Sequence, residues 1–361
     1  MNFDLCEEQE MLQSTVRQFA ATECPLPRAR EIFDAKDGHD PELWRGLCDL
    51  GLGGIQIEEA YGGAGLELLD LALVGEVLGE SAFPGPFFGH ALAALAIGLG
   101  GSEEQKRRWL PDLASGSAIG TIAFAEGDQM WQPEQWGLEA SEGGTRIEGH
   151  KCFVPHAGTA DIVVVGLAGG GMSVVERDCA ALDIKESAAL DRTRRVAEVE
   201  FTGAPAHPLP EGVAASGRVR DAGLVLLAAD AMGAAWRCVE LSVEYANRRE
   251  QFGTTIGHFQ ALKHQLADMA IEVEPARGLY WYAAHAFDHV PDESARFAAM
   301  AKAHLTDRAM QVARDAVEAH GGIGFTWEGD LHLYFKRAMF DRAFLGSPEF
   351  HRARAAELGG W

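Results

Sequence analysis

The chain has 361 residues, 47 % of them apolar, and a formal net charge of −23. A chain of this length exceeds what one hydrophobic core usually serves, so we expect two or three compact parts. The acidic balance argues against binding to nucleic acid, whose phosphates need a basic face, and against an anionic membrane surface. It leaves room for a small phosphate-bearing molecule that is held by a few local arginines.

The N-terminal segment MNFDLCEEQEM is acidic and lacks the apolar core of an export signal. No uninterrupted apolar run reaches ~18 residues, so we do not expect insertion into a membrane. The six cysteines are scattered without metal-binding spacing, which favours reduced thiols in a cytoplasmic protein and no metal site.

Three zones with different patterns of apolar residues follow one another along the chain. Residues 1–118 carry helical periodicity, and Ser102 is placed as the N-cap of the helix that starts in SEEQKRRW. Residues 119–212 are short β-branched or alternating runs separated by Gly, Asp and Pro, which are typical of a compact β-domain. Residues 213–361 return to long helical stripes, which pack as a bundle. The predicted fold class is α+β: an N-terminal helical domain, a central β-barrel or sandwich domain, and a C-terminal four-helix-type bundle.

Two arginines, Arg248 and Arg249, stand at the predicted end of a long helix, before a Phe-Gly break and a second helix. One interpretation is that they offset the negative end of the helix. The other is that they hold an anion, because a guanidinium satisfies phosphate oxygens with two parallel hydrogen bonds. A second candidate basic spot is the segment DRTRR, with Arg192, Arg194 and Arg195.

The segment RREQFG…HFQ, together with AHGGIGFTWEGDLHLYFKRA at 319–338, resembles the acyl-CoA dehydrogenase family. EEAYGGAG at 58–65 and LDRTRR at 190–195 match two further features of that family, whose helical–β–helical order fits nearly the whole chain. The resemblance implies an FAD-dependent oxidoreductase that desaturates an acyl-CoA in lipid or steroid catabolism. It also implies a homo- or hetero-oligomer, a dimer or tetramer, that can use an electron-transfer flavoprotein as its acceptor.

The same resemblance places FAD at a subunit interface and implies which positions hold it. Those on the diphosphate and adenine side are Arg249, Gln251, Phe252, Gln260, Glu318, Gly321 and Gly322, and those on the flavin side are Phe124 and Phe153. Glycines let backbone N–H groups approach a diphosphate without a Cβ in the way.

Three positions depart from the family pattern around the cofactor. Glu318 replaces a usual glutamine and would put an anion beside the diphosphate. Pro155 replaces a residue that touches the flavin through a hydroxyl, and Ala125 replaces a second hydroxyl. The histidines His156 and His320, beside these segments, are expected to be structural.

The catalytic base is the fourth departure. In this family a glutamate in an apolar pocket takes the α-proton, because burial raises its pKa toward neutrality. The two family positions of that base fall on Leu345 and Gly223, which accept no proton. The substitute carboxylates are Asp230, Asp341 and Glu76, each of which can equally be an ordinary solvated or capping carboxylate.

Three interpretations remain open from the sequence. The chain is a base-lacking subunit of a hetero-oligomeric dehydrogenase, a self-sufficient dehydrogenase with a displaced carboxylate base, or a non-catalytic acyl-CoA or flavin-binding scaffold on the same fold. A flavin monooxygenase on this fold is a related alternative.

Overall fold

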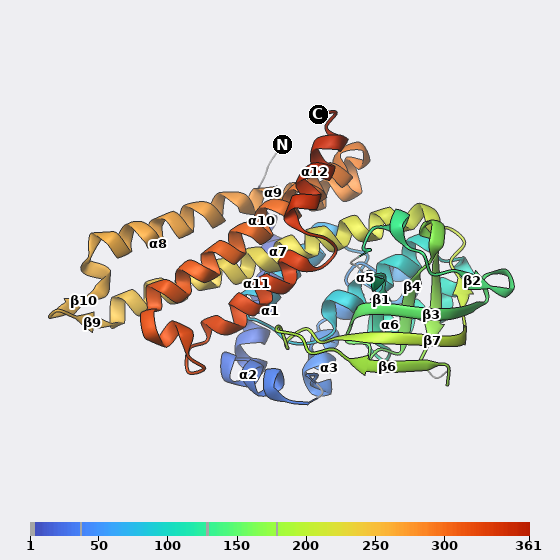
Figure 1. Cartoon of the computed structure of the whole chain (residues 1–361), viewed down its shortest axis with the longest axis horizontal. Coiled ribbons are helices and arrows are strands. Elements are labelled where there is room, and N and C mark those ends of the chain that lie inside the picture. The colour runs from blue at the N-terminus through green and yellow to red at the C-terminus, as the bar shows by residue number, and fades with distance from the viewer. Residues whose placement is uncertain (1–3, 37, 128–129, 178–179) are drawn as a thin grey trace. The chain divides into compact units, whose positions relative to one another are not determined.

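The structure is a computed structural model that describes residues 4–36, 38–127, 130–177 and 180–361. The chain divides into two compact units. We call them the helical unit, made of the chain up to Ala29, Ala72–Phe83 and Leu224–Trp361, and the mixed unit, made of Arg30–Leu71 and Pro84–Gly223. Helices α2, α4 and α7 contribute residues to both units, and Figure 1 follows the chain through them by colour.

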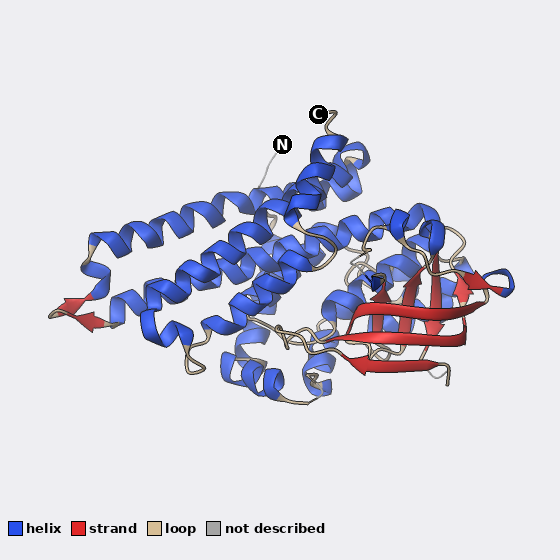
Figure 2. Ribbon diagram, in the orientation of Figure 1, coloured by secondary structure: helices blue, strands red, loops and turns tan. Residues whose placement is uncertain are grey.

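The helical unit is built mainly from long helices, which Figure 2 shows in blue. Its helices, including those shared with the mixed unit, are α1 (Glu7–Glu23), α2 (Leu26–Asp34), α4 (Leu68–Glu80), α7 (Gly212–Arg248), α8 (Gln260–Val273), α9 (Arg277–His289), α10 (Pro291–His320), α11 (Leu331–Ala343) and α12 (Pro348–Leu358). Short elements connect them: β9 (Glu250–Gln251), β10 (Thr254–Thr255), η7 (Ile256–His258), η8 (Glu274–Ala276) and η9 (Gly321–Phe325).

Helices α4 and α7 approach each other very closely in the helical unit, and glycines make this possible. A Cβ added to Gly233 on α7 would lie 1.8 Å from the backbone oxygen of Glu76 on α4. Reciprocally, a Cβ on Gly79 would lie 2.1 Å from the backbone oxygen of Asp230. The two backbones therefore touch at this crossing, because neither glycine places a side chain between them.

Helix α7 shows that hydropathy alone does not distinguish a membrane-spanning helix from a buried core helix. By length and composition it could cross a membrane, yet most of its apolar window is buried inside the protein. Its apolar residues, such as Val225, Leu227 and Met232, are core residues. This is the behaviour of the central helix of a helical bundle.

The mixed unit combines short helices with two sheets. Its helical elements are α3 (Pro41–Asp49), η1 (Leu52–Gly54), η2 (Glu59–Tyr61), α5 (Phe87–Gly100), α6 (Glu103–Ser115), η4 (Pro133–Gln135), η5 (Glu142–Gly144) and η6 (Ala168–Gly170). Its strands are β1 (Gly120–Ala123), β2 (Ala140–Ser141), β3 (Arg146–Pro155), β4 (Ile162–Gly166), β5 (Met172–Glu176), β6 (Leu182–Glu186), β7 (Val196–Pro205) and β8 (His207–Pro208).

The strands form one sheet in the order β1-β4-β5-β8 and another in the order β2-β3-β7-β6. Strands β1 and β4 are parallel, and the other neighbours are antiparallel. Apolar residues of both sheets share one buried core, to which β4 contributes Val163 and Val165 and β7 contributes Val199 and Phe201. The register between β3 and β7 shifts between Lys151 and Val154, so β3 carries an irregularity at Phe153.

The observed element types confirm the predicted fold class. Helices precede the strands, strands occupy the middle of the chain, and long helices follow. The predicted N-cap is confirmed too, because Ser102 Oγ accepts the Gln105 N–H at 3.3 Å and starts α6. The three domain ranges, 1–118, 119–212 and 213–361, stay a prediction.

Candidate functional site

The Phe-Gly break after the two arginines is a two-residue β-hairpin turn. Strands β9 and β10 pair antiparallel through Gln251 and Thr254, and the turn residues Phe252 and Gly253 have φ values of 56° and 78°. Positive φ at both central positions is the requirement of a type I′ turn. Glycine meets it freely, whereas Phe252 adopts it at a cost, and Phe252 is 92 % exposed. A strained backbone at Phe252 that leaves an aromatic side chain exposed is a reason to expect a binding role for this hairpin.

The two arginines at the end of α7 differ in what they contact. Arg248 lies within reach of Glu244, with Nη2 and Oε2 3.7 Å apart. Arg249 is exposed, and within the described part of the chain its guanidinium has no hydrogen bond or ion pair. Its backbone is fixed, since its N–H donates to Tyr245 and its carbonyl accepts from Ile256. Arg249 is therefore a firmly anchored cation that is available to a ligand.

A glycine turn lies near Arg249 at the end of α10. The Tyr245 ring stacks on the His320 ring with centroids 4.5 Å apart, which joins the ends of α7 and α10. Gly321 follows with φ 62°, and a Cβ on Gly321 or Gly322 would meet no described atom within 4 Å. An anion can therefore approach the backbone at Gly321 and Gly322, as a glycine-lined anion site requires.

The other positions expected on the diphosphate and adenine side lie at the same end of the helical unit. Gln251 follows Arg249 on β9, and its Nε2 donates to the Glu250 carbonyl at 2.7 Å. Gln260 is the exposed first residue of α8, and Glu318 is exposed in the last turn of α10. Arg249, Gln251, Phe252, Gln260, Glu318, Gly321 and Gly322 thus share one surface region, which we call the diphosphate face. In Figure 1, β9–β10 and the end of α10 occupy one end of the helical unit.

The positions expected on the flavin side lie in the mixed unit. Phe124 is buried, with its ring centroid 4.7 Å from that of Trp136. Phe153 lies in the irregular part of β3 with φ 53° and is 41 % exposed, and its ring centroid lies 5.7 Å from that of Trp131. Pro155 offers no N–H, and its carbonyl already accepts the Thr121 hydroxyl at 2.5 Å.

A buried ion pair supports this part of β3, and the sequence reasoning missed it. Lys151 Nζ lies 2.5 Å from Glu126 Oε1 and 3.2 Å from the Phe124 carbonyl oxygen. Glu126 also accepts the N–H groups of Gly137 and Leu138. Burial lowers the pKa of Lys151 to about 8, and the charge of Glu126 opposes that change. This ion pair connects the loop after β1 to β3. No sequence motif links positions 126 and 151, so the sequence alone did not predict the pair.

The two positions at which the family resemblance leads us to expect the base, Leu345 and Gly223, carry no titratable side chain. Leu345 is fully buried after α11 with φ 60°, and its carbonyl oxygen lies 2.9 Å from His351 Nε2. Gly223 lies within α7. Leu345 is held firmly in a backbone conformation that L-residues rarely adopt.

The substitute carboxylates are engaged inside the helical unit. Asp230 forms two contacts with Arg337, Nε–Oδ1 at 2.8 Å and Nη2–Oδ2 at 2.6 Å. Glu76 is buried and contacts Arg277 and the Tyr280 hydroxyl.

Asp341 is also fully buried, near the end of α11. Its backbone carbonyl accepts a hydrogen bond from the buried Lys302 ammonium. The Asp341 side chain has no exposure to solvent, so its position suits a structural role.

The DRTRR segment is not a free basic spot. Arg192 contacts Asp34 at 3.3 Å, and Arg194 is buried on Asp191 at 2.9 Å. Arg195 Nη2 donates to the carbonyls of Phe33 and Ala35. All three arginines are used inside the mixed unit, which distinguishes them from Arg249.

The two histidines beside the segments expected to bind the cofactor, His156 and His320, differ in burial and in their contacts. His156 is buried and has φ 44°, and burial lowers its pKa to about 3. His320 Nδ1 donates to the Ala316 carbonyl oxygen at 2.8 Å, as expected of a structural histidine. Among the described side chains, no group of three or more His, Cys, Asp or Glu residues could hold a metal ion.

Comparison with known proteins identifies the family. Residues 6–117 match the acyl-CoA dehydrogenase N-terminal domain, and residues 220–359 match the acyl-CoA dehydrogenase C-terminal domain. Acyl-CoA dehydrogenase IpdE2 of Mycolicibacterium smegmatis is 34 % identical over 345 residues, covering 95 % of this chain and 96 % of the relative. The protein of the same name from Mycobacterium tuberculosis is 36 % identical over 344 residues, covering 95 % and 94 %.

Solved structures agree with this assignment. A Tcur3481–Tcur3483 steroid ACAD variant is 31 % identical with a TM-score of 0.90, covering 98 % of each chain. The ChsE4–ChsE5 complex from Mycobacterium tuberculosis is 26 % identical with a TM-score of 0.89, covering 100 % of this chain and 99 % of the other. The chain therefore belongs to the acyl-CoA dehydrogenase family of FAD-dependent oxidoreductases that act on acyl-CoA thioesters.

Proposed function

We propose that this chain is the base-lacking subunit of a hetero-oligomeric acyl-CoA dehydrogenase, which grips the FAD diphosphate and leaves proton abstraction to a partner subunit. The observation that carries the proposal is the contrast between an available Arg249 and a buried, uncharged Leu345. The substrate is an acyl-CoA, and we propose that the enzyme works in the cytoplasm.

The diphosphate face supports the cofactor half of this proposal. Arg249 is a cation without a competing carboxylate in the described chain, and Gly321 and Gly322 leave backbone atoms uncovered. Guanidinium and backbone N–H groups are the donors that phosphate oxygens bind best. The residues present therefore fit a dinucleotide diphosphate. Glu318 is exposed in this region, so solvent limits its repulsion of the anion.

The missing base supports the other half. The α-carbon of an acyl-CoA is a weak acid, so its desaturation needs a positioned carboxylate, while FAD, when bound, accepts the β-hydrogen as hydride. Leu345 and Gly223 cannot take the α-proton. Asp230 has both oxygens on one guanidinium, and Glu76 is held by Arg277 and Tyr280. Asp230 and Glu76 are thus each engaged by a cation, which favours a base supplied by another chain.

Two of the similar structures, the Tcur3481–Tcur3483 steroid ACAD variant and the ChsE4–ChsE5 complex, are each named for two proteins together. This also favours a mixed oligomer. For this chain, the exposed rings of Phe252, Phe325 and Trp327 near the diphosphate face support burial by a neighbouring subunit.

Purification with and without a partner tests the proposal. The chain should be expressed alone and together with a dehydrogenase-like protein encoded beside it, and each preparation assayed for flavin absorbance and acyl-CoA desaturation. We expect flavin and turnover only in a stable mixed complex. A chain that purifies yellow and desaturates an acyl-CoA alone would refute the missing base and favour a displaced carboxylate. A chain without flavin in every preparation would favour a scaffold, and oxygen consumption with reduced flavin would favour a monooxygenase.

Two matched arginine variants test the cofactor role within that complex. Arg249→Ala should lower the FAD content of the complex at least about tenfold, because one charge-assisted contact to phosphate is lost. Arg248→Ala is the control, since Arg248 lies at the same helix end but faces Glu244. Equal flavin content in both variants would contradict the role of Arg249.

A further inference from the structure

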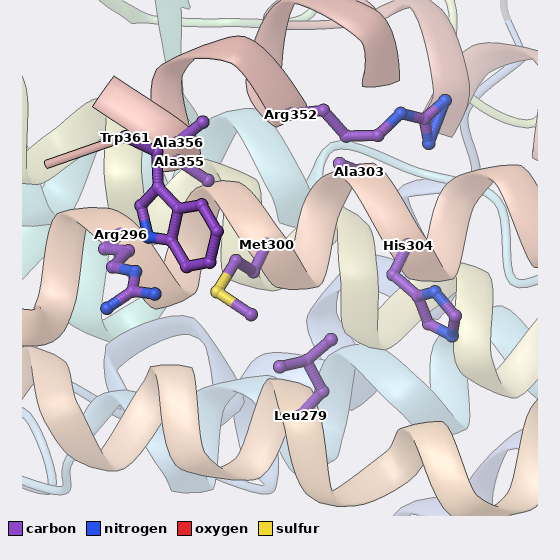
Figure 3. A pocket seen from close by; sticks show the side chains of 9 residues that line it. All are labelled: Leu279, Arg296, Met300, Ala303, His304, Arg352, Ala355, Ala356 and Trp361. Atoms are coloured by element: carbon purple, nitrogen blue, oxygen red, sulfur yellow. The ribbon is translucent and has the colours of Figure 1, made fainter. Parts of the chain in front are cut away.

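A solvent-open pocket of about 420 Å³ lies in the helical unit between α9, α10 and α12. Figure 3 shows the side chains around it. They are Leu279, Arg296, Met300, Ala303, His304, Arg352, Ala355, Ala356 and Trp361. Neither the proposed cofactor role nor the missing base uses any of these residues.

The cavity has an apolar middle and two polar ends. Met300 and Leu279 face each other across its middle, and Arg296 with Trp361 lies at one end (Figure 3). His304 and Arg352 lie at the other end (Figure 3). Small side chains of α12 leave the space between the helices open. An occupant must therefore combine an apolar body with one polar group.

The two arginines differ in the charge that they offer. Arg352 is neutralised, because Nη1 and Nη2 lie 2.8 and 2.6 Å from Asp307 Oδ2. Arg296 has no ion pair among the described residues, and its buried Nε has no hydrogen-bond acceptor. A Cβ built on Gly359 would lie 3.2 Å from Arg296 Cζ, so the end of the chain runs against this guanidinium.

The remaining polar group adds no charge near neutral pH. Burial lowers the pKa of His304, and the nearby Arg308 lowers it further. One uncompensated positive charge thus remains at the Arg296 end, in a protein of net charge −23. A buried donor without an acceptor costs free energy, which a bound acceptor would recover.

We propose that this cavity binds a small amphiphilic monocarboxylate. Its carboxylate pairs with Arg296, and its apolar body lies between Leu279 and Met300, beside the exposed Trp361. A purely apolar ligand would leave Arg296 without an acceptor. A multiply charged ligand would find only one unneutralised guanidinium among the lining residues. The volume is within the range of small-molecule sites, which also suits a body of several carbons.

Octanoate is a suitable probe, and 1-octanol is its uncharged counterpart. Calorimetry on the full-length protein, with its cofactor and any co-purifying subunit, should show saturable octanoate binding that 1-octanol does not match. Arg296→Gln should weaken octanoate binding at least about tenfold, the factor of one charge-assisted hydrogen bond. Arg314→Gln, which changes an exposed arginine later on α10, should bind octanoate as the parent does.

Two further variants separate this cavity from any other octanoate site. Met300→Trp fills the middle of the cavity and should abolish the Arg296-dependent binding. Trp361→Phe should keep most of the binding but lose the octanoate-dependent change in tryptophan fluorescence, because the other seven tryptophans are outside the cavity.

The proposal is overturned if octanoate shows no saturable binding, if 1-octanol binds as tightly, or if Arg296→Gln binds octanoate unchanged. Blocking of the cavity by a co-purifying subunit gives the same loss of binding and equally overturns it for the assembled enzyme. None of these results depends on flavin content, so they leave the proposed FAD role of Arg249 untouched.

Discussion

Asp230 and Arg337 form a buried two-point ion pair that joins α7 to α11 inside the helical unit, with contacts of 2.8 and 2.6 Å. Arg337 Nη1 also donates to the Phe83 carbonyl oxygen at 3.0 Å. A carboxylate considered as a substitute base is therefore a structural partner of a buried cation. Removing one member leaves the other charged and unpaired, which costs far more than the pair contributes.

Asp230→Asn should lower the free energy of unfolding by about 3–5 kcal/mol, the usual cost of breaking a buried pair. Denaturant unfolding measures it, with Asp268→Asn on the exposed side of α8 as the control. The double variant Asp230→Leu with Arg337→Met should recover much of the loss. A fully stable Asp230→Asn variant with no turnover would instead identify Asp230 as the base.

Gly233→Ala should destabilise the helical unit by about 3 kcal/mol, because the added methyl would lie 1.8 Å from the Glu76 backbone oxygen and force the two helices apart. Gly278→Ala is the matched control in α9, where a Cβ meets no described atom within 4 Å. That control should gain about 0.5–1 kcal/mol from higher helix propensity. Thermal unfolding of the two variants compares them directly, and equal melting temperatures would contradict the close crossing of α4 and α7.

Acid should destabilise the mixed unit through His90. This imidazole is fully buried, with Nε2 3.0 Å from the Gly53 carbonyl and Nδ1 accepting the Gly120 N–H at 3.2 Å. Both bonds need the neutral ring with its proton on Nε2, and burial lowers the pKa to about 4 from 6.5.

Between pH 6.5 and about 4 the unfolded chain binds a proton at His90 that the folded chain does not, so stability must fall as the pH falls through this window. The gap between the two pKa values corresponds to about 3 kcal/mol. Urea unfolding at pH 7.5 and 4.5 should therefore show a smaller pH dependence for His90→Gln than for the parent. An identical pH dependence in both would exclude His90 as its source.

Gly322→Ala separates a ligand role from a folding role. A Cβ at this position meets open space in the described chain, so the variant should unfold at the parent's denaturant midpoint. If a diphosphate approaches this backbone, the methyl group should lower the FAD content of the assembled enzyme about tenfold. Unchanged FAD content would remove Gly322 from the proposed cradle, whereas unfolding would show a structural need that the open space does not indicate.

The sequence by itself determined the order of helices and strands, because each element repeats its own hydrophobic period locally. It also gave the residue types at the positions where the family resemblance predicts the base, namely the uncharged Leu345 and Gly223. Neither statement needs knowledge of what lies next to a side chain in space.

Only the tertiary structure decided which charges are free. Arg194 and Arg249 look alike as letters, yet one is buried on Asp191 and the other has no partner in the described chain. The pairing of Asp230 and Glu76 could be seen only in three dimensions, since their partners lie 107 and more than 200 residues away along the chain. Electrostatic interaction depends on distance and burial, and both arise only when remote segments pack together.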